Sequence, residues 1–111
     1  MVHNEDNLVD DMEEMDTPEN GKKMMTMDDV ADRLQKDFSE EIADAKKYLC
    51  MAKIADCAGA YSDSHYLLEM AKDEYTHACF IHDFMERHDM RASEHHEKCY
   101  HKLEEEMAHF L

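Results

Sequence analysis

The sequence predicts an all-α protein, and three observations support this fold class. Only two of the 111 residues are glycine and one is proline, whereas Met, Ala, Glu, Lys and Leu are abundant, and these residues favour helices. Apolar residues recur every three or four positions through two long segments, which is the spacing of one helix face. The length permits one small domain.

The first 25 residues differ in composition from the rest of the chain. They combine many carboxylates with Pro18 and Gly21 and offer little apolar surface to bury. We therefore expect residues 1–25 to form an acidic, disordered tail, and residues 26–111 to form the helical domain.

The first predicted helix spans about residues 27–57. Thr26 can act as its N-cap, with Asp28 and Asp29 in the first turn, where acidic side chains favour a helix start. Gly59 can act as its C-cap.

Two further helices follow. Ser62, Asp63 and Ser64 are start signals for a helix over about 63–88, and Ser93 can cap a shorter helix over about 93–110. The first connection is short, so the two long helices are expected to fold back as an antiparallel hairpin.

Each long helix presents an apolar stripe when residues are placed about 100° apart. The stripe of the first helix comprises Val30, Leu34, Phe38, Glu41, Ala45, Tyr48, Ala52 and Ala55. That of the second comprises Leu67, Met70, Ala71, Glu74, His77, Ala78, Ile81, Phe84 and Met85. Glu41, Glu74 and His77 thus direct ionisable groups into the expected core. Burying an unpaired carboxylate costs several kcal/mol, so a bound cation is the simplest compensation.

The charge of the chain restricts its partners. Lys and Arg number 12 against 28 acidic residues, which gives a net charge of −16. Such a surface repels nucleic acid and anionic lipid, so neither is an expected partner, whereas it attracts metal ions. No Ser/His/Asp arrangement or Gly-rich phosphate loop supports a hydrolase or a nucleotide-binding protein.

Four cysteines are present, without a Cys-x-x-Cys pair: Cys50, Cys57, Cys79 and Cys99. This spacing excludes a rubredoxin or zinc-ribbon knuckle. No signal peptide or membrane-spanning run is evident, so we expect free thiols in a cytoplasmic protein.

Glu74 and His77 form a Glu-x-x-His pair, whose members share one side of a helix. Glu41 precedes Tyr48 by seven residues on the partner helix, and Glu74 follows Glu41 by 33 residues. Through Glu41-x6-Tyr48 and Asp73-Glu74-x-x-His77-Ala78, the segment 34–85 resembles the first helix pair of rubrerythrin and its ferritin-like relatives.

The resemblance implies an antiparallel four-helix bundle with a di-iron carboxylate centre. It implies that Glu41 is a terminal or chelating ligand, Glu74 a bridge between metals and His77 a nitrogen ligand. Tyr48 would donate a hydrogen bond to a ligating carboxylate. Because one helix pair carries half of the ligand set, a homodimer or higher homo-oligomer is expected to complete both bundle and centre. The wide apolar stripes also favour association.

The encapsulated ferritins are similar as well, since they are short chains that build an iron site between subunits. No cargo-loading tail is evident in residues 107–111. An encapsulin shell is therefore a less favoured partner than a second copy.

Carboxylate oxygens with one imidazole per metal suit Fe, and also Mn, better than structural zinc. The predicted function is oxidation of Fe(II) by O2 or peroxide, for iron handling or peroxide defence, by a ferroxidase- or peroxidase-type oxidoreductase. The alternative is a metal-free acidic helical interaction module in which Glu41, Glu74, His77 and Tyr48 form a hydrogen-bonded cluster.

Two groups are candidates for accessory metal binding. Asp37 and Asp44 lie about one turn from Glu41 and could guide ions towards it. Glu94, Glu97 and His101 form a dense group in the C-terminal helix. Solvated helix surface is the alternative interpretation of both groups.

Overall fold

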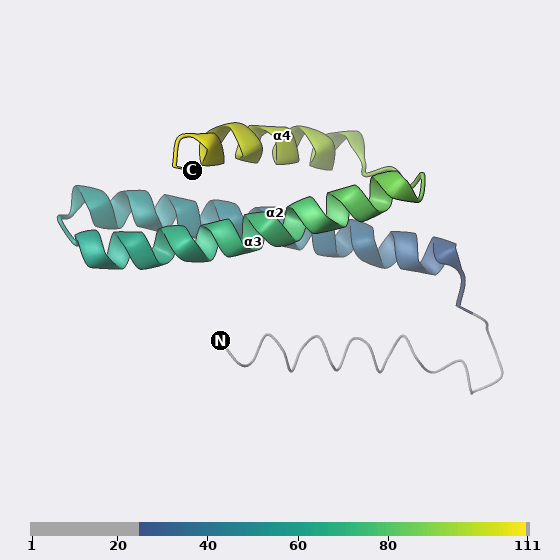
Figure 1. The fold of residues 1–111 in the computed structure, drawn as a ribbon, viewed down its shortest axis with the longest axis horizontal. Helices are drawn as coiled ribbons and strands as arrows, with labels where there is room; N and C mark the ends of the chain where they lie inside the picture. The colour runs from purple at the N-terminus through teal and green to yellow at the C-terminus, as the bar shows by residue number, and fades with distance from the viewer. Residues whose placement is uncertain (1–24, 111) are drawn as a thin grey trace. The chain divides into compact units, whose positions relative to one another are not determined.

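The computed structural model describes residues 25–110, which contain three α-helices and no strand (Figure 1). Helix α2 spans Met27–Cys57, α3 spans Tyr61–Arg87 and α4 spans Glu94–Ala108. The predicted all-α class is confirmed. The acidic tail expected for residues 1–25 lies, apart from Met25, outside the described residues. The core and the site described below lie within residues 31–111, which form one compact unit.

Local signals explain where α2 and α4 begin. The Thr26 hydroxyl accepts a hydrogen bond from the Asp29 N–H at 3.3 Å, while an Asp29 carboxylate oxygen accepts one from the Thr26 N–H at 2.7 Å. This reciprocal pair satisfies two backbone donors, as in a capping box. Ser93 Oγ likewise accepts from the His96 N–H at 3.1 Å.

Both long helices end in the same backbone motif. Gly59 has φ +80°, and the Ala60 N–H donates to the Ala55 carbonyl at 2.9 Å, which is the Schellman arrangement. At the end of α3, Asp89 takes the left-handed position with φ 57°, and the Met90 N–H donates to the Met85 carbonyl at 2.7 Å. The sequence signal at Gly59 is confirmed.

Helix α3 begins at Tyr61, two residues before the expected start, and no side chain caps it. Ser64, an expected start signal, instead donates from its hydroxyl to the Ala52 carbonyl at 2.7 Å. The capping expectation is wrong because the short connection brings this hydroxyl against α2, where it links the two helices.

Helices α2 and α3 run side by side in opposite directions, and α4 lies along the pair (Figure 1). All three contribute to one core of buried side chains: Phe38, Ile42, Ala45, Leu49, Ala71, Ala78, Tyr100, Leu103 and Met107. The Tyr100 ring joins the helices, since it stacks on His82 with centroids 4.5 Å apart and lies 5.3 Å from Phe38. The core therefore sits on the side of the hairpin that α4 covers.

The buried face of α2 is rotated from the expected stripe. Ile42 and Leu49, which were not in the stripe, are 3% and 2% exposed, whereas Glu41 and Tyr48 are only half-buried. Docking of α4 draws the core towards its own side of the hairpin. Phe38, Ala45 and Ala52 of the predicted stripe are buried as expected, whereas its Glu41 and Tyr48 lie at the edge of the core.

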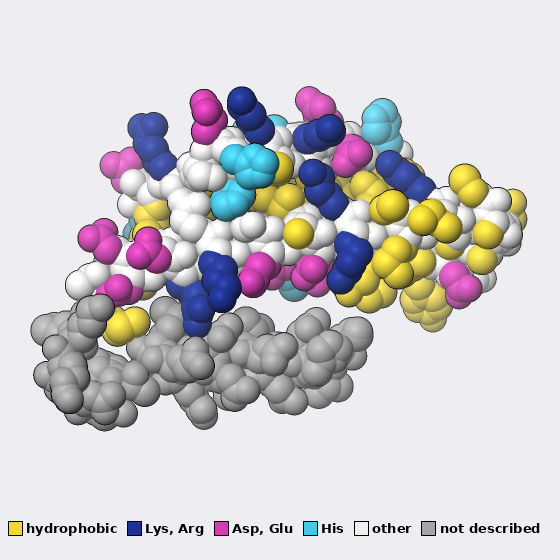
Figure 2. All heavy atoms as spheres, turned by 180° about the vertical axis from the view of Figure 1, so that it is seen from behind, with side chains coloured by type: hydrophobic (Ala, Val, Ile, Leu, Met, Phe, Trp, Pro, Cys, Tyr) yellow, Lys and Arg dark blue, Asp and Glu magenta, His cyan; other side chains and the backbone are white. Residues whose placement is uncertain are grey.

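Several large apolar side chains remain exposed: Met51, Ile54, Tyr61, Tyr66 and Phe80. Figure 2 shows hydrophobic side chains gathered at the end of the hairpin where α2 and α3 join. No helix among residues 25–110 is long and apolar enough to cross a membrane.

Candidate metal centre

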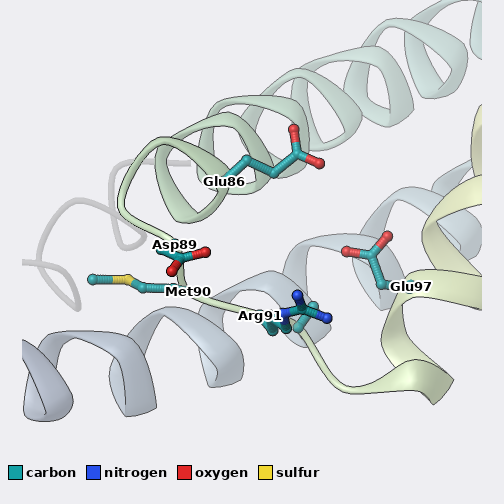
Figure 3. Close-up of a pocket in the computed structure, with 6 residues that line it drawn as sticks. Glu86, Asp89, Met90, Arg91 and Glu97 are labelled. Atoms are coloured by element: carbon teal, nitrogen blue, oxygen red, sulfur yellow. The ribbon is translucent and has the colours of Figure 1, made fainter.

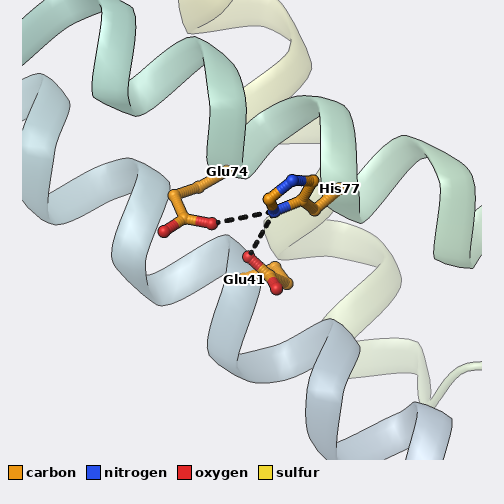
Figure 4. A group of neighbouring side chains, drawn as sticks. All are labelled: Glu41, Glu74 and His77. Carbon is orange, nitrogen blue, oxygen red and sulfur yellow. Dashed lines mark hydrogen bonds and ion pairs between the residues drawn. The ribbon is translucent and has the colours of Figure 1, made fainter. Parts of the chain in front are cut away.

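The hairpin brings Glu41, Glu74 and His77 together, as Figure 4 shows. Glu41 projects from α2 towards α3, where Glu74 and His77 lie one turn apart. His77 Nδ1 is 3.1 Å from Glu74 Oε1 and 3.5 Å from Glu41 Oε1. Each residue offers a ligand atom, and the three atoms lie within 4.8 Å of one another.

The three side chains differ in exposure. Glu74 is 16% exposed, Glu41 is 26% exposed and His77 is 56% exposed. The expectation that all three would be buried therefore fails for His77 within a single chain. The reason is that α4 covers the opposite side of the hairpin and lies behind the site in Figure 4.

The surroundings of Glu41 disfavour its ionised form. Its Oε1 atom is buried and accepts no hydrogen bond from the described residues. Burial, the adjacent Glu74 carboxyl and the charges of Asp44 and Asp37 together raise the pKa of Glu41 to about 9. Each of these causes disfavours the ionised carboxylate.

These residues fit a divalent cation. Donor atoms bound to one ion at about 2.0–2.2 Å lie roughly 3 Å apart, close to the 3.1 and 3.5 Å separations from His77 Nδ1. A cation would also give the Glu41 oxygen its missing partner and neutralise the two adjacent carboxylates. Two carboxylates and one imidazole form a donor set suited to Fe or Mn.

Tyr48 lies on the same side of α2 as Glu41 and is half-buried. The Lys47 ammonium is 4.9 Å from the centroid of its ring. Among the described residues, the Tyr48 hydroxyl makes no hydrogen bond with Glu41 or Glu74, so the hydrogen bond implied by the family resemblance stays a prediction.

Asp37 and Asp44 are both half-buried on α2. Their charges contribute to the raised pKa of Glu41, which places them within electrostatic reach of it. Asp44 also lies 3.7 Å from the Lys47 ammonium. A role in guiding ions stays a prediction.

The accessory group in α4 is only partly assembled. Glu97 Oε1 is 3.3 Å from His101 Nε2, whereas Glu94 lies exposed in the first turn. Glu97 also contacts His82 Nε2 at 2.9 Å. Sequence reasoning missed His82, although its spacing of four residues from Ala78 and three from Met85 places it on the buried face of α3.

Comparison with protein families matches residues 32–109, well over half of the chain, to the family described as Rubrerythrin. The matched range contains all three residues of the centre. No curated protein and no solved structure matches the chain.

Proposed function

Because the chain belongs to the rubrerythrin family, we propose that it binds Fe(II) at Glu41, Glu74 and His77 and promotes its oxidation by O2 or peroxide. The ferritin-like, all-helical fold agrees with this proposal. The observation that carries it is the buried Glu41 oxygen without a hydrogen-bond donor, set beside a second carboxylate and an imidazole. A metal ion is the partner that this oxygen lacks.

A second copy of the chain completes the proposed centre. One hairpin supplies two carboxylates and one imidazole, which is half of the four Glu and two His of a di-iron site. The side of the hairpin away from α4 keeps Tyr48, Met70 and Phe84 only half-buried. Pairing two hairpins through this face would cover these side chains and His77, and would bring two half-sites together.

The chain's own groups position and neutralise the iron rather than transfer protons. Glu41 and Glu74 offset the positive charge, and His77 adds a neutral nitrogen donor. Bound iron would supply the electrons, one from each Fe(II) that becomes Fe(III), to O2 or peroxide.

Anaerobic Fe(II) titration followed by admission of air tests the proposal. We expect this centre to bind about one iron per chain, because one Glu-x-x-His set serves each metal, and to form Fe(III) after air enters. Glu74→Ala should remove the iron of this centre and abolish Fe(III) formation. Asp73→Ala is the matched control, since Asp73 is an exposed neighbour on the same helix.

Iron binding and oxidation that are undiminished in Glu74→Ala would show that the ligand assignment is wrong. A wild-type chain that binds no iron would instead favour the metal-free interaction module.

A further inference from the structure

His82 lies at the contact between α3 and α4. The residue is 9% exposed, and its ring stacks on Tyr100 with centroids 4.5 Å apart. Its Nε2 atom is 2.9 and 3.2 Å from the two carboxylate oxygens of Glu97. A carboxylate can only accept hydrogen bonds, so Nε2 carries the proton and donates it to Glu97.

The other ring nitrogen faces a different group of oxygens. Nδ1 is 3.9 Å from Glu86 Oε1, which is longer than a hydrogen bond. His82, Asp83 and Glu86 offer ligand atoms within 4.8 Å of one another. In the neutral Nε2–H tautomer, Nδ1 keeps a lone pair on the side of Glu86.

The neighbouring pocket, lined by both helices and their connection, is rich in acidic groups. Figure 3 shows Glu86 on α3 and Glu97 on α4 directing their carboxylates into it, with Asp89 and Arg91 on its walls. The lining of the pocket thus includes three carboxylates and one guanidinium, and its net negative charge favours a cation.

We propose that His82 Nδ1, Asp83 and Glu86 form a second metal site, which binds a divalent transition-metal ion of the Mn²⁺ or Fe²⁺ class. Glu97 is a positioning residue, because metal-ligating histidines usually donate their other N–H to a carboxylate that fixes the ring. One imidazole and two carboxylates leave coordination positions open to water. These hard oxygen donors favour Mn²⁺ or Fe²⁺ over thiolate-seeking ions.

This site is separate from the Glu41 centre. His77 and His82 are five residues apart on α3, so their side chains leave the helix in directions about 140° apart. His82 points towards α4 and His77 away from it, and the two ligand groups share no residue. Either site can therefore be removed without the other.

Mn²⁺ titration of the full chain in physiological salt tests the proposal, with unbound Mn²⁺ measured by electron paramagnetic resonance. Mn²⁺ is chosen because the four thiols would compete for Zn²⁺. In a Glu74→Ala background, which removes the first centre, we expect one Mn²⁺ per chain to remain. Adding Glu86→Gln or Asp83→Asn to this background should raise the dissociation constant for Mn²⁺ at least tenfold.

Glu97→Gln should weaken binding by about 10–100-fold while leaving all three ligands in place. Glu105→Gln, which removes an exposed carboxylate of α4 outside the cluster, is the matched control and should leave the affinity unchanged. Broadening of the His82 ring resonances at low Mn²⁺ would locate the ion.

Equal Mn²⁺ affinity in Glu86→Gln and Glu105→Gln would overturn the proposal, and would leave His82 as a structural bridge between two carboxylates. Loss of all Mn²⁺ binding in Glu74→Ala would overturn it as well. Loss of iron oxidation alone would bear on the first centre and not on this one.

Discussion

Glu41 shows how one side chain sets the chemistry of the hairpin. Its buried oxygen lacks a hydrogen-bond donor, and its carboxyl lies beside Glu74. In the metal-free chain, protonation of Glu41 relieves this stress, which couples folding to pH.

We predict that the free energy of unfolding of the metal-free protein falls as pH rises from about 5 to about 9. The Glu41 pKa is raised from 4.5 to about 9 in the folded chain, so between these values the folded state holds one more proton than the unfolded state. The stabilising contribution is complete below pH 4.5 and is lost as pH approaches 9. Urea denaturation in the presence of chelator measures this slope.

Glu41→Gln should flatten the slope, because the amide does not titrate, while Glu69→Gln, an exposed carboxylate on α3, should leave it unchanged. A slope that is the same in wild type and Glu41→Gln would contradict the assigned pKa.

Among the helices, the signals that lie within one turn were predictable from sequence. The caps at Thr26 and Ser93 and the motif at the left-handed Gly59 involve residues three to five positions apart. The start of α3 was not predictable from sequence, because the Ser64 hydroxyl donates to a backbone carbonyl of α2 instead of capping α3. Local propensity cannot anticipate a partner twelve residues away.

The proximity of the three candidate ligands was predictable from sequence, but their burial was not. Helical spacing alone placed Glu74 beside His77, and the hairpin placed Glu41 opposite them. The orientation of the core depends on where α4 docks, which helical periodicity in α2 and α3 does not encode. The same docking buries His82 and provides Glu97 as its acceptor.

Helix α4 should be sensitive to its cap. Ser93→Ala removes the acceptor of the His96 N–H and should lower the free energy of unfolding by about 1 kcal/mol. Ser62→Ala is the matched control, because Ser62 lies in the first turn of α3 without a capping hydrogen bond, and it should change stability by less than about 0.5 kcal/mol. Chemical denaturation of both variants measures these changes. Equal losses in the free energy of unfolding would show that Ser93 does not stabilise α4.

Across the whole chain, a net charge of −16 coexists with exposed Met51, Tyr66 and Phe80. Large apolar side chains exposed on a hairpin favour association. Repulsion between like charges opposes association, and this repulsion weakens at higher salt. Metal binding between copies would reduce that repulsion.

We predict that the protein is a dimer and that Met70→Lys shifts it to monomer. Met70 is half-buried and lies seven residues before His77, on the face that we propose to pair. A buried ammonium there should raise the dissociation constant at least about tenfold. Analytical ultracentrifugation measures the change.

Phe110→Lys, at a 39% exposed apolar position beyond the end of α4, should remain dimeric. A monomeric wild type, or a Met70→Lys variant that still pairs, would argue against the shared face.

Gln35 joins α2 to the connection that precedes α4. Its amide nitrogen donates to the Arg91 carbonyl, and its amide oxygen accepts from the Ser93 N–H. Deamidation, the slow hydrolysis that converts such a side chain to glutamate as a protein ages, would keep the acceptor but lose the donor. The new carboxylate would face the Arg91 carbonyl and push the connection away. The extent of deamidation at Gln35 would thus determine how strongly the connection before α4 is bound to α2.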